Sequence, residues 1–228
     1  MQIARWKVFT TVAELRDAAI IAVLNSARTA IAARGRFDLV LAGGSTPRDI
    51  YQALRHAGAD WSKWHVWYGD ERCLPPQHED RNSKMAEDAW LNHVCIHAAQ
   101  VHPMPTELGS LEAAKRYSQS LSDLAEFDLV LLGLGEDAHT ASLFPGQAWE
   151  SQPAQPAIAV ANAPKPPPDR VSLSASRLSL ARQVLFIVTG AGKQDAVARW
   201  KQGELLPVRA ICPVAGVDIF LDAEAVHS

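Results

Sequence analysis

The chain has 228 residues, of which 48% are hydrophobic and 21% are charged, and its formal net charge is −3. This length and apolar content suit one α/β domain with a sizeable core and leave little room for a second. The slightly acidic balance does not favour nucleic acid as a partner, so an anion site would need a local cluster of cations.

The predicted elements alternate between helix and strand. Thr11 and Glu14 have the spacing of a capping box and predict a helix that runs to about Arg34, with Gly35 as its stop. Continuous apolar runs predict buried strands at 37–44, 65–72, 127–135 and 183–190, and helical patterns lie at 47–57, 83–94, 110–124 and 191–202. The alternation predicts a parallel sheet flanked by helices, and because no linker divides the chain we expect a single domain over 1–228.

Polar or flexible residues follow each predicted strand. These segments are "GGSTP" (43–47), "GDER" (69–72), "GLGEDAH" (133–139) and "TGAGK" (189–193). Ligands of open parallel sheets bind outside the carboxyl ends of the strands. We therefore expect the four segments to converge on one crevice.

The segment "GGSTP" has the composition of an anion-binding turn. Gly43 and Gly44 allow a tight turn and close approach to a ligand, Ser45 or Thr46 can cap the following helix, and Pro47 suits its first turn. The free amides and the positive helix end would then face an anion such as phosphate. The alternative is an ordinary strand-to-helix turn.

The segment "TGAGK" places Lys193 in the first turn of a predicted helix, where the macrodipole disfavours a cation. A ligand anion in front of the helix would explain this position, and the alternative is a solvated lysine near Asp195. The segment is not a Walker loop, because Ile187 stands where its first glycine should be and Gln194 replaces the serine or threonine. A nucleoside triphosphate is therefore not expected.

The segment "GLGEDAH" formally fits a dinucleotide-binding pattern, but Glu136 and Asp137 would face the pyrophosphate. Its informative residue is His139, which can act as a general base near neutral pH. The alternative for His139 is a histidine satisfied by local hydrogen bonds.

The segment "GDER" carries Asp70, Glu71 and Arg72. The guanidinium of Arg72 could bind a phosphate through two parallel hydrogen bonds, or it could form an internal ion pair with its acidic neighbours. A metal site is not predicted, because His93, Cys95 and His97 offer no obvious fourth ligand. No G-x-S-x-G elbow anchors a serine-hydrolase triad.

Five segments together resemble the glucosamine-6-phosphate isomerase/6-phosphogluconolactonase family, and within it the 6-phosphogluconolactonases. They are "LAGGSTPRDIY", "WYGDERCLPPQHEDRNSKM", "GLGEDAHTASLFPG", "PKPPPDRVSLS" and "TGAGK", and they follow the family's order. The chain departs from the family pattern at Ala138, where glycine is usual, and at Arg81, where serine is usual. Arg81 would either add a cation near the site or face solvent.

The resemblance implies a Rossmann-like fold of the glucosamine-6-phosphate deaminase and ribose-5-phosphate isomerase type. It implies that His139 is the general base and that Asp70 and Asp137 support the site, with Asp137 a candidate to orient His139. It implies phosphate and substrate binding by a further group of residues, namely Gly43, Gly44, Ser45, Thr46, Arg72, Arg170 and Lys193.

The function that the resemblance implies is hydrolysis of a sugar-phosphate δ-lactone, 6-phosphogluconolactone, in the oxidative pentose phosphate pathway. His139 would take a proton from the attacking water, so neither a metal nor an organic cofactor is required. One alternative is an amino-sugar phosphate deaminase or isomerase, although "TASLFPG" after His139 favours the lactonase. Another is a non-catalytic sugar-phosphate sensor, which would not need His139.

The sequence also predicts the compartment. Cys73, Cys95 and Cys212 are few and far apart and form no C-x-x-C pair, which favours a reducing environment. The amino terminus lacks the apolar run of a signal peptide, and no segment approaches the roughly 20 apolar residues that span a bilayer. We expect a soluble cytoplasmic protein without membrane partners, either a monomer or a small homo-oligomer.

Overall fold

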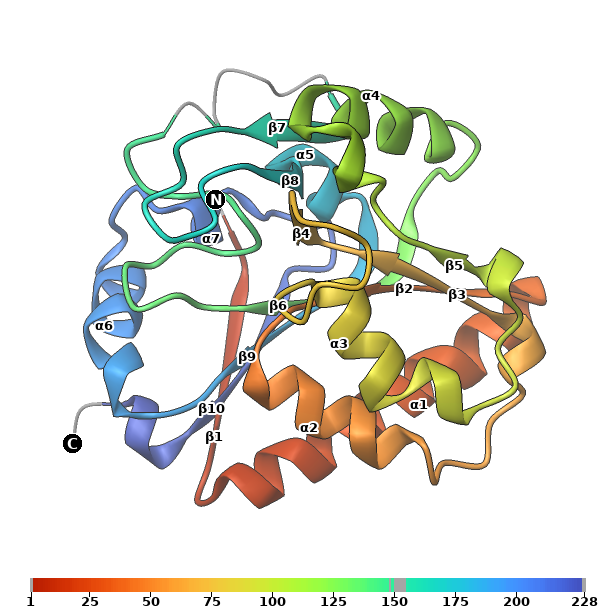
Figure 1. Cartoon of the computed structure of the whole chain (residues 1–228). Coiled ribbons are helices and arrows are strands. Elements are labelled where there is room, and N and C mark those ends of the chain that lie inside the picture. Colours follow the sequence, from red (N-terminus) through yellow and green to blue (C-terminus); the bar gives the residue numbers. More distant parts are fainter. Residues whose placement is uncertain (1, 148, 150–154, 227–228) are drawn as a thin grey trace.

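The central feature of the fold is a seven-stranded sheet, seen in a computed structural model that describes residues 2–147, 149 and 155–226. All pairings between neighbouring strands are parallel. The strand order is β1 (Ala4–Phe9), β10 (Val217–Asp222), β9 (Ala181–Val188), β6 (Phe127–Gly133), β2 (Phe37–Leu41), β3 (Trp64–Tyr68) and β5 (Val101–His102) (Figure 1).

Further elements cover the sheet. Helices α1 (Val12–Arg34), α2 (Ser45–Leu54) and α3 (Asn82–Ala89) lie on one side (Figure 1). On the other side lies an antiparallel sheet of β4 (Asp70–Arg72), β8 (Arg170–Leu173) and β7 (Ala157–Val160), against which α4 (Ser110–Ser120) packs. The remaining helices are α5 (Ala175–Ser179), α6 (Gln194–Gln202) and α7 (Pro207–Ala210). The predicted parallel sheet with flanking helices is confirmed.

The first helix begins and ends where the sequence predicts. The backbone N–H of Glu14 donates to Thr11 Oγ1 over 3.2 Å, and Glu14 Oε2 accepts from the amide of Thr10. At the other end Gly35 adopts a left-handed conformation and its amide bonds to the carbonyl of Ile31. These contacts satisfy backbone groups that the helix itself leaves unpaired.

One predicted strand is wrong. The apolar run at 65–72 is not a single strand, because β3 ends at Tyr68 and the amide of Gly69 bonds to the carbonyl of Leu41. The next residues form β4, which leaves the main sheet and pairs antiparallel with β8. No strand was predicted from the sequence at the positions of β1, β5, β7, β8 and β10.

The arrangement of strands fixes where a ligand can bind. Strand β2 lies between β3 and β6. After β2 the chain adds β3 and β5 on one side of it, and then adds β6, β9 and β10 on the other side. A topological switch therefore separates the carboxyl ends of β2 and β6, and open α/β sheets bind ligands in the crevice at such a point. Among the described residues, no helix is long and apolar enough to cross a membrane.

Candidate active site

A cavity of about 300 Å³ lies at the carboxyl ends of these strands. It is lined by the segments that follow β2, β3 and β6, by residues of the loop before β8, and by Lys193 at the end of the 3₁₀ turn Ala191–Lys193. The predicted convergence of four strand ends is confirmed. Of the predicted site residues, those that line the cavity are Gly43, Gly44, Asp70, Arg72, His139, Arg170 and Lys193.

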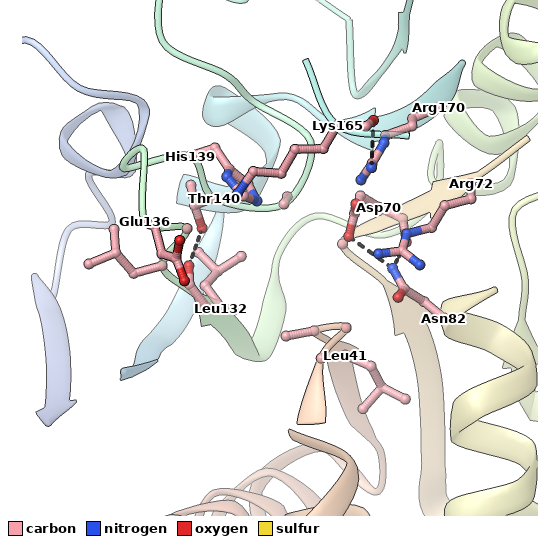
Figure 2. Close-up of a pocket in the computed structure, with 18 of the residues that line it drawn as sticks. Leu41, Asp70, Arg72, Asn82, Leu132, Glu136, His139, Thr140, Lys165 and Arg170 are labelled. Carbon is pink, nitrogen blue, oxygen red and sulfur yellow. Dashed lines mark hydrogen bonds between the residues drawn. The ribbon is translucent and has the colours of Figure 1, made fainter. Parts of the chain in front are cut away.

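His139 and Asp137 form a hydrogen-bonded pair beside the cavity. The distance from His139 Nδ1 to Asp137 Oδ1 is 2.5 Å, and the histidine side chain is 19% exposed. An ionised carboxylate can only accept, so Nδ1 carries the proton and the lone pair of a neutral ring lies on Nε2. The pair therefore leaves Nε2 able to accept a proton (Figure 2 shows His139 at the cavity).

A tight turn brings the two side chains together. The amide of Gly135 donates to the carbonyl of His139, and Thr140 Oγ1 donates to the carbonyl of Gly133. A Cβ atom on Gly135 would lie 1.9 Å from His139 Nδ1, so only glycine fits there. Ala138 takes the left-handed conformation with φ of 68°, which costs an L-residue roughly 1–2 kcal/mol. The turn is thus kept although alanine replaces the family's usual glycine.

Burial and the aspartate act on His139 in opposite directions. Burial lowers the pKa of His139 below its ordinary 6.5, although the hydrogen bond and negative charge of Asp137 favour the protonated form. Burial alone would raise the pKa of Asp137, but the hydrogen bond and charge of His139 outweigh it, so this pKa is lowered. The ring is accordingly neutral at neutral pH while Asp137 is ionised.

The start of α2 presents backbone donors to the cavity. Gly44, with φ of 108°, is the N-cap residue, and no side chain of the described residues caps this helix. The prediction that Ser45 or Thr46 caps it is wrong, because both lie inside the first turn. Ser45 is exposed, and Thr46 Oγ1 lies 2.7 Å from Thr189 Oγ1, which joins the start of α2 to the end of β9. The uncapped amides remain available to an anion.

Lys193 approaches the same region from the start of α6. It is the N-cap residue of that helix and is partly buried. Burial lowers the pKa of Lys193, and the carboxylate of Glu136 opposes this effect. Both residues line the cavity.

Arg72 and Arg170 are direct cross-strand partners in the smaller sheet. The ion pairs of the described residues involve neither Arg72 nor Arg170, and Glu71 pairs with Arg81 instead, so the predicted alternative of an internal pair for Arg72 does not hold. Arg72 Nε is buried with no hydrogen-bond partner among the described residues, while Nη1 donates to the carbonyl of Asp80. Like charges placed side by side favour an anion between them.

The acidic neighbours of Arg72 have other partners. The buried carboxylate of Glu71 accepts from the backbone amides of Arg72, Asn82 and Ser83 over 2.8–2.9 Å. Asp70 accepts from the Asn82 side chain over 3.1 Å and from Ser142 Oγ over 2.6 Å (Figure 2 shows the Asn82 contact). These bonds fasten the start of α3 to β4, next to the cavity.

Arg81 takes neither of its expected positions. It is 3% exposed, its Nε lies 3.4 Å from Glu71 Oε2, and its Nη2 donates to the carbonyl of Met104. It also lies 3.3 Å from Glu107 Oε2. Arg81 is therefore a buried, paired residue behind the site, which does not face solvent or line the cavity.

Several residues that line the cavity were not assigned from the sequence, namely Asn82, Glu136, Thr140 and Lys165. Each lies within a segment that carries the family resemblance. Asn82 could have been found from the sequence, because it directly follows Arg81 in "HEDRN", within one of the five segments that carry the family resemblance. Within the described ranges, no three histidine, cysteine or acidic residues are placed to hold a metal ion.

Comparison with known proteins identifies the class. The model of the family described as glucosamine-6-phosphate isomerases/6-phosphogluconolactonase matches residues 10–220. A 6-phosphogluconolactonase of Synechocystis is 37% identical over 92% of each chain, and one of Mycobacterium leprae is 39% identical over 76% of each. The chain belongs to this family.

Solved structures agree with the fold. The 6-phosphogluconolactonase of Trypanosoma brucei has a TM-score of 0.88 at 26% identity, covering 99% of this chain and 98% of that one. A monomeric glucosamine-6-phosphate deaminase has a TM-score of 0.83 at 18% identity, covering 97% of this chain and 98% of that one, and shows the fold alone. The fold type that the resemblance implied is confirmed.

The first prediction concerns the pair at the centre of the site. Replacing Asp137 with Asn removes a negative charge that favours the protonated imidazole, so the pKa of His139 should fall further below its value in the parent. NMR titration of the histidine side chains measures this value, with His139→Gln used to assign the signal. An unchanged or raised pKa would show that Asp137 does not act on the ring.

Proposed function

We propose that this protein hydrolyses 6-phospho-D-glucono-1,5-lactone to 6-phosphogluconate in the oxidative pentose phosphate pathway. The observation that carries the proposal is a histidine held by a carboxylate, whose Nε2 has no hydrogen-bond partner among the described residues, in a cavity that several cations line. Relatives named 6-phosphogluconolactonase at 37–39% identity support the same reaction.

The reaction needs one proton acceptor. His139 Nε2 takes a proton from water as the water oxygen bonds to the lactone carbonyl carbon. The carbonyl electron pair moves to its oxygen, and the resulting tetrahedral intermediate collapses as the ring C–O bond breaks. His139 then returns the proton to the departing ring oxygen, and the product carboxylic acid ionises. Asp137 holds the ring in the required tautomer and stabilises its protonated form.

The phosphate would bind away from the reacting carbonyl. We assign it to the uncapped start of α2, at Gly43 to Thr46, together with Lys193, because Thr46 and Thr189 join these two segments. Arg72, which also lines the cavity, supplies a further donor to the substrate. Binding energy from the phosphate would orient the lactone toward His139.

Wider properties follow from this proposal. We place the enzyme in the cytoplasm, because its three cysteines are free thiols and two of them are exposed. We propose that residues 1–228 form one catalytic domain that acts on a small sugar-phosphate lactone. It would work without nucleic acid, as a monomer or a small homo-oligomer.

The second prediction tests the reaction and its base together. The purified protein, treated with a chelator, should hydrolyse the lactone faster than buffer. His139→Ala should lose about 10²–10⁴-fold in turnover at saturating substrate, which is the usual contribution of a general base. Rates are corrected for spontaneous opening, and circular dichroism confirms that the variant folds. A folded parent at the spontaneous rate would refute the proposed hydrolase, and a variant near the parent's turnover would refute His139 as its base.

The third prediction concerns the phosphate. Lys193→Met keeps the length of the side chain but removes a charged donor, so KM for the phosphorylated lactone should rise roughly 10-fold or more. Lys201→Met is the matched control, since Lys201 is exposed on α6 and its ammonium contacts the Trp6 ring. The parent should also prefer the phosphorylated lactone to gluconolactone. The phosphate assignment fails if Lys193→Met lowers kcat/KM equally for both lactones.

A further inference from the structure

Lys165 occupies a place in the site that its sequence position does not reveal. It belongs to the proline-rich segment before β8, lines the cavity, and extends its side chain toward His139 (Figure 2). Its Nζ lies 3.6 Å from Asp137 Oδ1, and the side chain is 46% exposed. The ammonium therefore reaches the catalytic pair while keeping room to move.

Arg170 holds the backbone of this segment. Its Nη2 donates to the carbonyls of Lys165 and Pro166 over 3.1 and 3.0 Å, and its Nε donates to the carbonyl of Pro167 over 3.0 Å. Arg170 itself is 4% exposed. Arg170 was expected to bind substrate, but most of the hydrogen bonds of its guanidinium go to the backbone of the segment that carries Lys165.

Lys165 and His139 share one oxygen atom. Asp137 Oδ1 accepts from His139 Nδ1 and also faces the ammonium of Lys165. The charged groups that act on His139 are Asp137 from the same turn, Lys165 from the proline-rich segment and Asp70 from β4. Among the cations that line the described cavity, Lys165 is thus the one whose charge reaches the base.

This position lies at the reacting end of the substrate. The water that His139 activates must lie against the carbonyl carbon, so the carbonyl oxygen develops its charge close to His139. A cation that reaches the developing oxyanion lowers the barrier, because it binds the transition state more strongly than the ground state. A lysine stem has enough rotatable bonds to move its ammonium from Asp137 to such an oxygen.

We propose that Lys165 is a catalytic residue that binds the lactone carbonyl oxygen and stabilises its negative charge, and that Arg170 is a positioning residue that holds Lys165 in place. This rests on the proposed lactonase function. The charge on the oxygen appears as the water oxygen bonds to carbon and disappears as the ring C–O bond breaks. Once Lys165 turns to the substrate, Asp137 is left to His139 alone, which favours uptake of the proton.

The fourth prediction tests this role with variants of matched length. Lys165→Met should lower kcat roughly 10²-fold with little change in KM, as expected for loss of a group that acts on the oxyanion. Lys165→Arg should recover part of the loss. Lys115→Met is the control for the removal of one positive charge, because Lys115 is exposed on α4 outside the cavity, and it should behave like the parent.

A pH profile separates this role from a merely structural one. Removing the ammonium that faces Asp137 should move the acid limb of kcat/KM to higher pH in Lys165→Met, whereas the limb of Lys115→Met should not move. A folded Lys165→Met variant that keeps the parent's kcat and acid limb would overturn the role of Lys165. A raised KM with unchanged kcat would also overturn it, because that result describes a phosphate ligand.

The role of Arg170 is tested by a double-mutant cycle. Arg170→Lys should lower kcat in the parent but have little further effect in the Lys165→Met background, because it acts through Lys165. Equal increases in KM in both backgrounds would show that Arg170 binds the phosphate directly and would overturn the positioning role. An inactive parent would instead refute the proposed lactonase function, so the two failures are distinguishable.

Discussion

The hydrogen bond between Asp137 and His139 is the interaction on which the rest of the site depends. It fixes the proton on Nδ1 and so leaves Nε2 as the acceptor. Its geometry requires a glycine at 135, because any side chain there would collide with the imidazole. It also requires a left-handed residue at 138, which the chain supplies as a strained alanine. Such local strain persists only where the surrounding bonds enforce it, as the bonds of Gly135 and Thr140 do here.

The sheet topology explains why this pair meets its substrate. The turn that holds His139 follows β6, and the uncapped start of α2 follows β2, so the topological switch places a base and an anion site side by side. The smaller sheet closes the other side of the cavity with Arg72 and Arg170. Buried Glu71 then ties the start of α3 to β4 through backbone amides, which fixes the Arg72 side of the cavity. The base and the cations thus belong to separate elements of a rigid frame.

Much of this arrangement could be predicted from the sequence. Continuous apolar runs located β2, β6 and β9, and the polar residues after them located the cavity. Periodicity could not predict that Gly69 sends the chain into a second sheet, because β4 is as buried as β3 and follows it directly. Strand β1 was missed because it is an edge strand with alternating exposure, which is a weaker signal than a continuous run.

The side-chain contacts were harder to predict than the elements. Lys165 had no predicted role, since its place in the site depends on a bond network with Arg170 that only the folded loop creates. Arg81 was expected near the ligand or in solvent, yet it lies buried against Glu71 and Glu107, which come from different parts of the chain. Arg81 contacts a residue that is distant in the sequence, and Lys165 is held through backbone carbonyls. Neither kind of contact can be predicted from a local sequence motif.

The central claim is that a partly buried His139, held by the carboxylate of Asp137, acts as the base. The most direct measurement is the pH dependence of kcat/KM for lactone hydrolysis, corrected at each pH for spontaneous opening. Burial lowers the pKa of His139, and the base works only when neutral, so activity should persist as pH falls and the midpoint of its acid limb should lie below 6.5. A midpoint at or above 6.5, or a rate with no acid limb, would contradict the account.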